Sequence, residues 1–447
     1  MPQSNAVITG MGVVSAIGVG CENFFEGLLQ KKSGVTSLLN RVDDRCEFDG
    51  TPEPAGLWVG APILDFQAKQ FVKPRKAMKV MCREIQTAFA ASLMAIEGAG
   101  LDGFIPATAE SVIKPQDLGT VFGSEIFYGS PLELSDSIRP CIQDDGQIDT
   151  SAFGNAAMKQ IMPLWMLKYL PNMPACHVGI HLNSHGPNNS IVLGDVSGPS
   201  ALMEATSCVD RGTAKVVLTG GTGTRIGTTR LNFRADYPMA ESFDPVENSS
   251  RPHDPTSTGV VGGEGAAAMV IEPAEFAKQR GVRPVARVVS YSSRFAAAKG
   301  MKTPMRCKET SDVQMRSSTK AIQSAIESAM SDAGIDSKDL GLVVSHGTGD
   351  PVADAAEQAA TDATVPSVPT LATVASLGHT GAGCGSIDLV AGAMALHRNL
   401  VPPTLHDKRL TPVSRFVDEP TRLQGDHVMC ICHNTEGNAT AIVLGRP

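Results

Sequence analysis

Short apolar strands that alternate with amphipathic helices are the feature of this sequence that most constrains its fold. Strands are predicted at residues 6–9, 118–122, 215–219, 265–272, 342–345, 428–432 and 439–444, and helices at 22–30, 83–99, 320–333, 353–361 and 386–397. Such alternation favours an α/β layered fold. No low-complexity segment or short-period repeat is present, so any likeness between the two halves is expected in their architecture rather than in their sequence.

The segment 244–263 lies between the two series of strands and helices and is rich in Pro, Ser, Thr, Asp and Gly. We expect a long ordered loop there, because no flexible linker interrupts the pattern. A chain of 447 residues is long enough for two or three domain-sized units, or for one large unit with an internal duplication. We therefore expect two halves, residues 1–255 and 256–447, that are joined near residues 245–275.

The charge balance and the cysteines narrow the class of protein. The formal net charge is −8, so general attraction to nucleic acid or to an anionic membrane is not expected. The N-terminal residues lack the pattern of a signal peptide, and no run of about 18 apolar residues predicts membrane insertion. The ten cysteines include no CxxC pair, which is typical of reduced thiols, and we expect a cytoplasmic protein.

Three histidines, His177, His181 and His185, are spaced four residues apart, and on a helix they would share one face that could bind zinc. Pro174 and Gly186 lie close by and disfavour a regular helix, and no carboxylate with suitable spacing accompanies the histidines. We favour a segment packed at an interface, with partly hydrogen-bonded histidines, over a metal site.

Two glycine motifs follow predicted strands. Gly10-Met11-Gly12 resembles the beginning of a dinucleotide-binding fingerprint, but Ser15 stands where the third glycine is required. The motif Gly220-Gly221-Thr222-Gly223 lacks the Lys and the Ser or Thr of a phosphate-binding loop, and we interpret it as a tight turn. No cofactor is therefore expected.

Two other histidines stand where α/β folds form active sites. His346 follows the predicted strand 342–345 and opens a glycine-rich segment, and His379 lies in a similar segment before the predicted helix 386–397. Active sites form at the carboxyl ends of strands, and glycines there allow close approach of the backbone. Either histidine alone could be a hydrogen-bonded core residue, but two in equivalent places favour a shared site.

Taken together, these segments resemble the β-ketoacyl-ACP synthase family, the elongating ketosynthases of the thiolase superfamily. The resemblance covers nearly the whole chain. It is carried by residues 7–18 (similar to VVTGxGxxSPxG), 250–254 (SRPFD), 263–266 (GEGAG), 346–357 (HGTxTxxGDxxE) and 378–379 (the GH of KSxxGH). It implies a thiolase-like αβαβα layered fold with two similar halves.

Members of this family use one cysteine and two histidines. The cysteine carries the acyl chain as a thioester, and the histidines assist decarboxylation of malonyl-ACP and stabilise the enolate and the oxyanion. The resemblance assigns the histidine roles to His346 and His379. It assigns the cysteine position to Asp195, when residues 211–212 and 220–221 are aligned without gaps to the family's helix end and strand end. Cys208 lies thirteen residues later and is expected to be buried along the helix.

Three further positions depart from the family. The lysine of KSxxGH corresponds to Val374, and the loop that gates the acyl pocket, GFGGTN in the family, reads His433-Asn434-Thr435-Glu436-Gly437-Asn438. The aromatic residue of the loop after the SRPFD-like segment corresponds to Val260. The resemblance implies that Val260, Thr435 and Thr348 contact the substrate.

The chemistry of a carboxylate limits what Asp195 can do. At a helix start it is well suited to be an N-cap and to meet the positive end of the helix dipole. Acyl transfer to it would give a mixed anhydride, which is high in energy and short-lived. Its negative charge would also oppose the carboxylate of malonate as it approaches the histidines.

Three functions remain open. The chain could be a non-condensing partner subunit, similar to the chain-length factors that lack the cysteine and pair with an active ketosynthase, although it keeps both histidines. It could instead decarboxylate malonyl-ACP or transfer acyl groups with His346 and His379, because decarboxylation needs histidines and oxyanion donors rather than a thiol. It could also be a functional 3-oxoacyl-ACP synthase with an atypical site.

The resemblance also implies partners. We expect an acyl carrier protein, and either a homodimer or a heterodimer with an active ketosynthase, formed along the strand that follows the histidine trio. Basic residues without an intervening acid are expected to attract the acidic carrier, the alternative being a solvated basic helix. They are Lys69, Lys73, Arg75, Lys76, Lys79 and Arg83.

Overall fold

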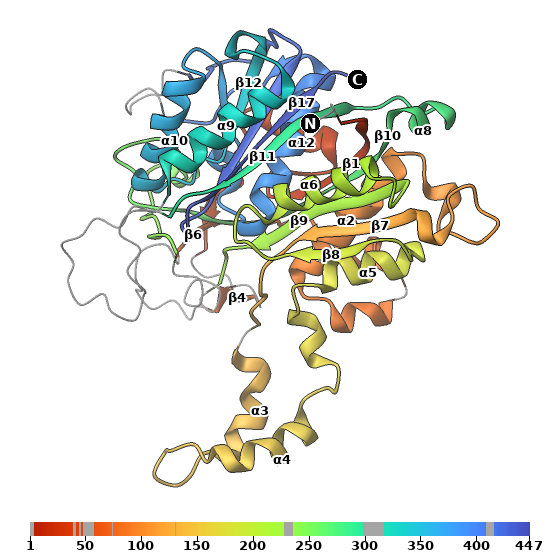
Figure 1. The fold of residues 1–447 in the computed structure, drawn as a ribbon. Coiled ribbons are helices and arrows are strands. Elements are labelled where there is room, and N and C mark those ends of the chain that lie inside the picture. Colours follow the sequence, from red (N-terminus) through yellow and green to blue (C-terminus); the bar gives the residue numbers. More distant parts are fainter. Residues whose placement is uncertain are drawn as a thin grey trace.

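A single mixed sheet of 13 strands passes through the molecule (Figure 1). The computed structural model describes residues 4–38, 58–73, 75–129, 131–227, 236–297, 317–407 and 415–447, and the backbone of 42–43 and 46–47. The main strands follow the order β13-β12-β16-β17-β11-β1-β10-β9-β7-β8. In the middle of this order β1 pairs with β11 only through Val7 and Ile8, so the sheet consists of two parts that meet at a short seam.

The first part of the sheet combines parallel and antiparallel pairs. Strand β7 is parallel to both β8 and β9, whereas β9, β10 and β1 pair antiparallel. Its strands and helices are β1 (Ala6–Ser15), α2 (Arg83–Gly98), β7 (Leu118–Gly123), α5 (Met173–Leu182), β8 (Asn188–Ile191), α6 (Ser197–Asp210), β9 (Val216–Thr224) and β10 (Gly262–Pro273).

The second part repeats the first in element order and in strand direction. Strand β12 is parallel to both β13 and β16, and β16, β17 and β11 pair antiparallel. Its elements are β11 (Ala286–Phe295), α9 (Thr319–Ala333), β12 (Leu340–Ser345), α10 (Pro351–Thr364), β13 (Thr370–Ala372), α12 (Cys384–Arg398), β16 (His427–His433) and β17 (Asn438–Gly445). The predicted pair of similar halves is thereby confirmed.

Shorter elements complete the described chain. The strands are β2 (Gly18–Val19), β3 (Thr36–Ser37), β4 (Val42–Asp43), β5 (Cys46–Glu47), β6 (Val59–Ala61), β14 (Leu400–Val401) and β15 (Thr421–Arg422). The helices are α1 (Cys21–Leu29), α8 (Ala274–Gln279) and α11 (Val374–Leu377). Single 3-10 turns precede several strands, as at Pro115–Asp117 and Ser337–Asp339.

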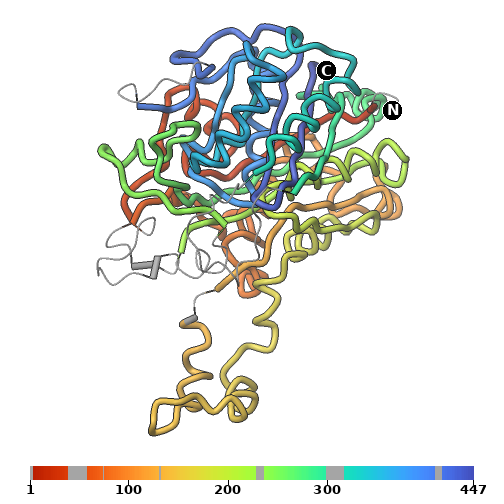
Figure 2. The backbone as a smooth tube through the Cα atoms, turned by 60° about the vertical axis from the view of Figure 1, so that its left-hand side comes forward, coloured from red at the N-terminus to blue at the C-terminus, as the bar shows by residue number. Residues whose placement is uncertain are grey.

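Helices α6 and α12 form the middle of five layers (Figures 1 and 2). Helix α12 contacts β16 of one part and β9 and β10 of the other, and all but its last two residues are buried. Helices α2 and α5 cover the outer face of the first part, and α9, with α10 against it, covers the second. The αβαβα arrangement matches the fold class expected from the sequence.

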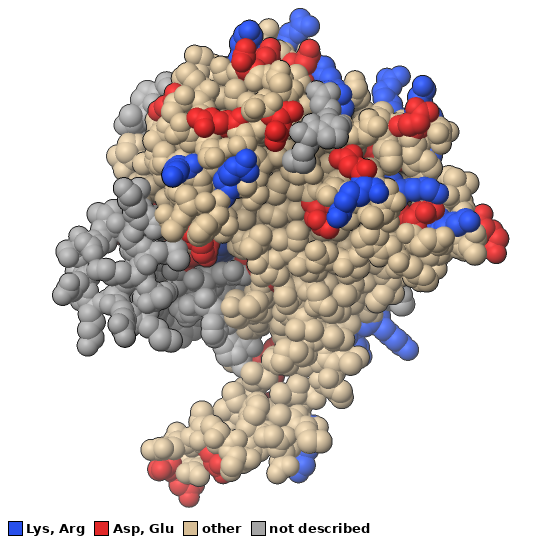
Figure 3. Space-filling view, viewed as in Figure 1, with Lys and Arg blue, Asp and Glu red and all other residues tan. Residues whose placement is uncertain are grey.

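A helical arm leaves the body between β7 and α5 (Figures 1 and 2). It contains η5 (Pro131–Leu134), α3 (Ser135–Ile138), η6 (Arg139–Cys141), α4 (Thr150–Gln160) and η7 (Trp165–Tyr169). Acidic side chains gather at its tip (Figure 3), where Asp144 and Asp145 are exposed. The sequence pattern predicted no element here, because no apolar periodicity marks the arm: α4 has no buried residue.

Two interpretations of the sequence were wrong. Gly220 and Gly221 do not form a tight turn, because β9 continues through them to Thr224. The basic segment is not a regular helix but two short 3-10 helices, η1 (Ala68–Gln70) and η2 (Arg75–Val80).

The division of the chain into halves at 255/256 stays a prediction, although β10 belongs by its pairing to the first part of the sheet. In the described ranges, no helix is both long and apolar enough to cross a membrane.

The glycines of the Gly10-Met11-Gly12 motif allow α2 to lie against β1. A Cβ added at Gly10 would come 2.0 Å from the carbonyl oxygen of Ala95, and one at Gly12 would come 2.1 Å from that of Ala91. Both contacts are with helix backbone, which cannot move away as a side chain can. The motif is therefore a close helix–strand contact rather than a phosphate site.

We predict that Gly12→Ala lowers the free energy of unfolding by about 1–3 kcal/mol, because the added methyl group overpacks this contact. Gly103→Ala is the matched control, since a Cβ there meets nothing within 4 Å. Its effect is expected to stay within about 0.5 kcal/mol. Urea denaturation measures both variants, and equal stabilities would contradict the role given to Gly12.

Candidate active site

Three loops bring Asp195, His346 and His379 together in the interior. Asp195 lies in the turn between β8 and α6, His346 follows β12, and His379 follows α11. The Nε2 atoms of His346 and His379 lie 3.7 and 3.5 Å from Asp195 Oδ2. All three side chains are buried. The expected meeting of these residues is therefore present in the structure.

The turn that carries Asp195 is fixed by its own hydrogen bonds. Gly194 has a φ of 61°, which favours glycine, and the Ser197 hydroxyl accepts the Leu193 N–H at 2.8 Å while donating to the Gly194 carbonyl. The helix cap is Val196, and no side chain caps it. The N-cap interpretation of Asp195 was therefore wrong: its carboxylate points into the interior instead.

The partners of the Asp195 carboxylate are Arg225 and Tyr237. Arg225 Nη2 donates to Oδ1 at 2.9 Å, and the Tyr237 hydroxyl donates to Oδ2 at 3.0 Å. Arg225 also binds Asp236 through Nη1 at 2.6 Å. A buried carboxylate needs such charged and hydrogen-bonded partners, because it has lost its hydration. This network replaces the capping bonds that the sequence suggested.

The charges around Asp195 decide its protonation. Burial alone would raise the pKa of Asp195, but the positive charges of His379 and Arg225 hold the pKa well below its usual value. Arg225 is the permanent partner, since a guanidinium is always charged, whereas a histidine contributes only when protonated. Burial lowers the pKa of His346. The site at neutral pH therefore contains an ionised Asp195 and a neutral His346.

The Nδ1 atom of each histidine has a neighbour that orients the ring. The Gly381 N–H donates to His379 Nδ1 at 3.2 Å, so in the neutral ring the proton is on Nε2. His346 Nδ1 lies 3.5 Å from Cys432 Sγ, and that thiol also lies 3.2 Å from the Asp195 carbonyl oxygen. Both Nε2 atoms are buried and have no hydrogen-bond partner among the described residues.

The end of β16 and the loop after it add a second buried pair behind His346. His433 Nε2 lies 3.1 Å from Glu357 Oε2, and the His433 ring meets the His346 ring edge-on with centroids 4.8 Å apart. Burial would raise the pKa of Glu357, but the His433 hydrogen bond lowers it below its usual range. Asn434 in the same loop donates to the Leu193 carbonyl at 3.0 Å. The loop thus supports both His346 and the turn of Asp195.

The residues expected to contact substrate are distributed around this centre. Thr348 is buried, and its hydroxyl donates to Asp354 at 2.8 Å. Val260 packs with Tyr237 and Ala353, and Thr435 is half-buried in the loop of Asn434. Their substrate contacts stay predictions.

Most of the basic residues form no ion pair with another residue that the structure describes. Lys69, Lys73, Arg75, Lys76 and Lys79 are all exposed. Arg83 is not available for docking, because it pairs with Glu264 at 3.3 Å and donates to the Ile63 carbonyl at 2.8 Å.

The histidine trio is not brought together as a metal site. A regular helix was not expected here, yet His177 and His181 belong to α5, because Pro174 lies in its first turn, where proline is tolerated. The helix ends at Leu182, before His185. His181 instead packs against the Phe89 ring. Within the described chain, the only His, Cys, Asp and Glu cluster with metal-ligand spacing is that of Asp195, His346 and His379.

The cysteines of the described chain are free thiols. Cys430 and Cys432 are free thiols, and Cys208 is buried in α6 as expected. Burial raises the pKa of Cys432 well above its ordinary value, and the neighbouring Asp195 charge adds to the effect. Burial also raises the pKa of Cys384. The thiols nearest the site are therefore protonated.

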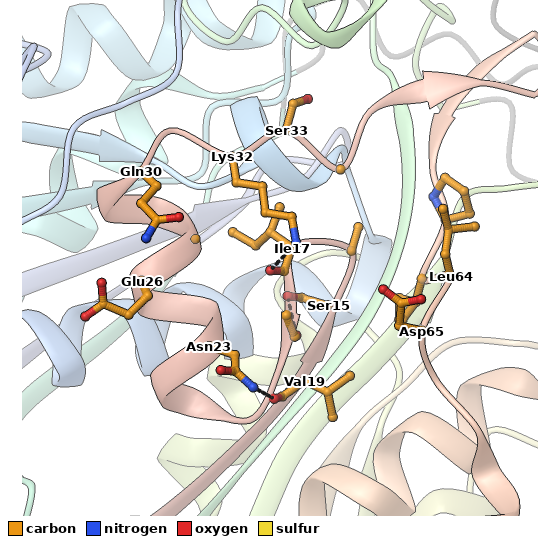
Figure 4. Close-up of a pocket in the computed structure, with 16 residues that line it drawn as sticks. Ser15, Ile17, Val19, Asn23, Glu26, Gln30, Lys32, Ser33, Leu64 and Asp65 are labelled. Carbon is orange, nitrogen blue, oxygen red and sulfur yellow. Dashed lines mark hydrogen bonds between the residues drawn. The ribbon is translucent and has the colours of Figure 1, made fainter.

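A hollow lies beside α1, and none of these residues lines it (Figure 4). Its volume is about 660 Å³, and its lining includes Asn23, Glu26 and Asp65. Lys32 donates to the Ile17 carbonyl at its wall at 3.3 Å, and Asn23 donates to the Val19 carbonyl at 3.0 Å. Lys32 and Asn23 thus bond to the wall itself, whereas Glu26 accepts a hydrogen bond at 3.2 Å from Arg398, which is outside the lining. None of the predicted site residues lines the hollow.

Sequence reasoning missed Arg225 and Tyr237. Arg225 directly follows β9, so its place at the end of a strand was a usable signal. Tyr237 lies outside any helix or strand, and nothing in the sequence pattern marks it.

Comparison with known families assigns nearly the whole chain. The family models described as Beta-ketoacyl synthase, N-terminal domain, and Beta-ketoacyl synthase, C-terminal domain, match residues 3–277 and 299–408. The 3-oxoacyl-[acyl-carrier-protein] synthase 2 of Synechocystis sp. is 26% identical over 421 residues, which cover 91% of this chain and 88% of the relative. The protein of the same name from Staphylococcus aureus strain COL is 27% identical over 405 residues, 90% of this chain and 87% of the relative.

Solved structures agree in fold. A β-ketoacyl synthase from Burkholderia phymatum STM815 has a TM-score of 0.78 and 23% identity, covering 99% of this chain and 100% of its own. The ishigamide ketosynthase/chain length factor has a TM-score of 0.74 and 21% identity, with full coverage of both chains. A further match, with a TM-score of 0.74, 18% identity and full coverage of both chains, is AntDE:AntF, a type II PKS acyl-carrier protein in complex with its ketosynthase bound to the hexaketide. These likenesses confirm the predicted fold class.

We predict energetic coupling between Asp195 and Arg225. Arg225→Gln is expected to lower the free energy of unfolding by about 3–5 kcal/mol, because it leaves a buried carboxylate without its charge partner. Adding Asp195→Asn removes that carboxylate's charge, so the double variant is expected to be more stable than the sum of the single effects by about 0.5–3 kcal/mol.

The exposed pair Lys338–Asp336, at 3.3 Å, is the matched control for this cycle. Its coupling, measured with Lys338→Gln and Asp336→Asn, is expected to stay below about 1 kcal/mol. Simple additivity at Asp195 and Arg225 would mean that the two side chains do not depend on each other.

Proposed function

The chain belongs to the β-ketoacyl synthase family, and we propose that within it this protein is a subunit of fatty-acid or polyketide synthesis that binds acyl- or malonyl-ACP but does not condense them alone. The observation that carries this proposal is the ion pair at the centre of the site. The family resemblance assigns the position of the cysteine to Asp195, and Arg225 and Tyr237 occupy both oxygens of its carboxylate. An ionised carboxylate held in this way is a poor acyl acceptor.

No other described thiol replaces the missing nucleophile. Cys432 lies nearest to His346, but its pKa is raised well above the ordinary range by burial and by the charge of Asp195. Cys384 faces Thr380, and burial raises its pKa as well. Because the thiolate is the reactive form of cysteine, neither residue supports an atypical condensing site.

Decarboxylation of malonyl-ACP is the second candidate, favoured by one observation. The Nε2 atoms of His346 and His379 have no hydrogen-bond partner in the described part of the chain and face the same point. These groups could donate to a thioester oxygen as it gains negative charge. Asp195 opposes this role, since its charge lies 3.5–3.7 Å from both histidines and would repel the malonyl carboxylate.

A dimer belongs to the same proposal, as a homodimer or as a heterodimer with a cysteine-containing ketosynthase. Strand β8 ends the sheet order, and its residues Asn188 and Asn189 are exposed. An edge strand with open N–H and C=O groups can pair with the same strand of another subunit. The ishigamide ketosynthase/chain length factor is a structural relative, which supports a heterodimer.

The proposal predicts that the purified chain forms no acyl adduct when incubated with acyl-ACP and malonyl-ACP, as measured by intact mass. Asp195→Cys is expected to gain the mass of one acyl group, because it supplies a thiol at the start of α6. Asp195→Ala is the control for loss of the carboxylate without gain of a nucleophile, and no acyl group can form a covalent bond to it. Condensation or an adduct on the unmodified chain would refute the proposal.

The same incubations separate the alternatives. Release of CO₂ from malonyl-ACP by the isolated chain would favour the decarboxylase. Co-purification with a cysteine-containing ketosynthase would favour the partner subunit.

Carrier docking is predicted to depend on the exposed basic segment that includes Arg75 and Lys76. Arg75→Glu combined with Lys76→Glu is expected to weaken carrier binding at least about tenfold, and the wild-type affinity is expected to fall as salt is added. The matched control is Lys320→Glu with Lys338→Glu, the same charge change at two other exposed lysines. Calorimetry at two salt concentrations measures all three proteins, and equal affinities would place docking elsewhere.

A further inference from the structure

The partners of Asp195 form a receptor for a carboxylate, and we propose that Asp195 is the ligand built into that receptor. Arg225 Nη2 and the Tyr237 hydroxyl donate to its two oxygens at 2.9 and 3.0 Å. The Nε2 atoms of His346 and His379 face Oδ2 from 3.7 and 3.5 Å. The receptor thus takes a small monocarboxylate, such as formate, when the Asp195 carboxylate is removed, and it refuses a second carboxylate while Asp195 is present.

The groups that line the receptor present donors rather than lone pairs. The Gly381 N–H occupies His379 Nδ1, so the proton of the neutral His379 ring is on Nε2, the atom that faces Asp195. A lone pair on His346 Nε2 would face an ionised carboxylate, so a proton is favoured there too, with Nδ1 beside the Cys432 thiol at 3.5 Å. Such a lining suits an anion and does not suit a cation.

Arg225 and Tyr237 supply the strong interactions. A guanidinium is always charged, and burial raises the pKa of Tyr237 well above its usual value, so the hydroxyl keeps its proton. Arg225 Nη1 binds Asp236 at 2.6 Å, which leaves Nη2 for Asp195. Because the charges of Asp236 and Glu125 also act on this guanidinium, a further carboxylate is expected to bind with modest affinity.

Asp195 leaves part of the receptor unused. Both histidine Nε2 atoms are buried and have no hydrogen-bond partner among the described residues, which is costly for polar atoms. The turn that carries Asp195 is fixed by the bonds of Ser197 to Leu193 and Gly194, and it holds the carboxylate at these distances. A free carboxylate has no such tether and can move toward the histidines while it still reaches Arg225.

The same arrangement names the class of carrier-bound substrate, and this step rests on the proposed function. Malonyl-ACP brings a carboxylate that competes with Asp195 for the same donors and is repelled by its charge. Acetyl-ACP and longer acyl-ACPs bring none. The chain is therefore expected to bind a carrier with an uncharged acyl group in preference to malonyl-ACP.

Titration of full-length Asp195→Ala with sodium formate tests the receptor, because this substitution removes a group of the size of formate. Calorimetry is expected to give one formate per chain with a dissociation constant of about 1–10 mM, since a ligand of three non-hydrogen atoms binds no tighter. The melting temperature of the variant is expected to rise with formate. The wild type, whose receptor is filled, is expected to show neither response, and sodium chloride at the same concentrations corrects for ionic strength.

Three controls separate the receptor from general salt effects. Formamide, which has the size of formate without its charge, is expected not to bind to Asp195→Ala. Asp336→Ala removes an exposed carboxylate that pairs with Lys338 at 3.3 Å, and it is expected not to respond to formate. Arg225→Gln added to Asp195→Ala is expected to weaken formate binding more than about tenfold, since it removes the charged donor.

Circular dichroism checks that each variant is folded. Folded Asp195→Ala that binds no formate, or that binds it equally with and without Arg225→Gln, would overturn the proposal.

NMR of the isotope-labelled wild type tests the same arrangement without a substitution, and so decides it even where the variant does not fold. At neutral pH, the rings of His346 and His379 are expected to carry a proton on Nε2. A ring with its only proton on Nδ1 would turn a lone pair toward Asp195, and either histidine in that form would contradict the receptor.

Acetyl-ACP and malonyl-ACP test the substrate class, because they differ only by the carboxylate. The wild type is expected to bind malonyl-ACP at least about tenfold more weakly, and Asp195→Asn is expected to reduce that difference. Equal affinities of the wild type for the two carriers would overturn the substrate class. Binding of neither carrier would contradict the proposed function instead, while the formate titration still decides the receptor.

Discussion

Close contact between the two middle helices and the sheets is the constraint on which the rest of the structure depends. A Cβ at Gly198 of α6 would lie 2.3 Å from the Ser386 hydroxyl of α12, and one at Gly123 of β7 would lie 2.3 Å from the Gly198 nitrogen. Gly385 of α12 meets the Pro199 ring in the same way, at 2.4 Å. These glycines let the beginnings of α6 and α12 meet between two sheets. The turn before α6 and the loop before α12 must then lie side by side, and this contact brings Asp195 to His379.

The centre is buried, so its charges depend on partners supplied by the protein. Of the three site residues, Asp195 would cost the most free energy if its buried side chain had no partner, because it is charged. Arg225, at the end of β9, supplies its counter-charge, and Asp236 holds the other side of the guanidinium. His346 is supported from behind by His433 and Glu357. The site is therefore a continuation of the core, and a change to its charges acts on stability as well as on chemistry.

The sequence was informative where burial and periodicity coincide. The strands before His346 and before Gly123 are fully buried runs bounded by glycine, and both were predicted within two residues of their observed ends. The glycines at 220–221 were misjudged because their small size serves contacts with β10 and α12, which no local pattern reveals. The three loops of the site could be predicted, since each follows a strand or precedes a helix. The partner of Asp195 could not, because pairing across 30 residues is set by the packed fold.

The interactions at Asp195 also show why a helix start can serve different chemistries on one scaffold. A thiol there needs nearby donors only when an oxyanion forms, and it is neutral until it reacts. A carboxylate is charged from the outset, so it demands a permanent cation. Once Arg225 is committed to Oδ1, the two histidines meet Oδ2, an acceptor, at distances too long for good hydrogen bonds. Both Nε2 atoms therefore stay without a hydrogen-bond partner among the described residues. In the same position, a thiol would leave the two histidines to donate to an acyl oxygen as it gains negative charge.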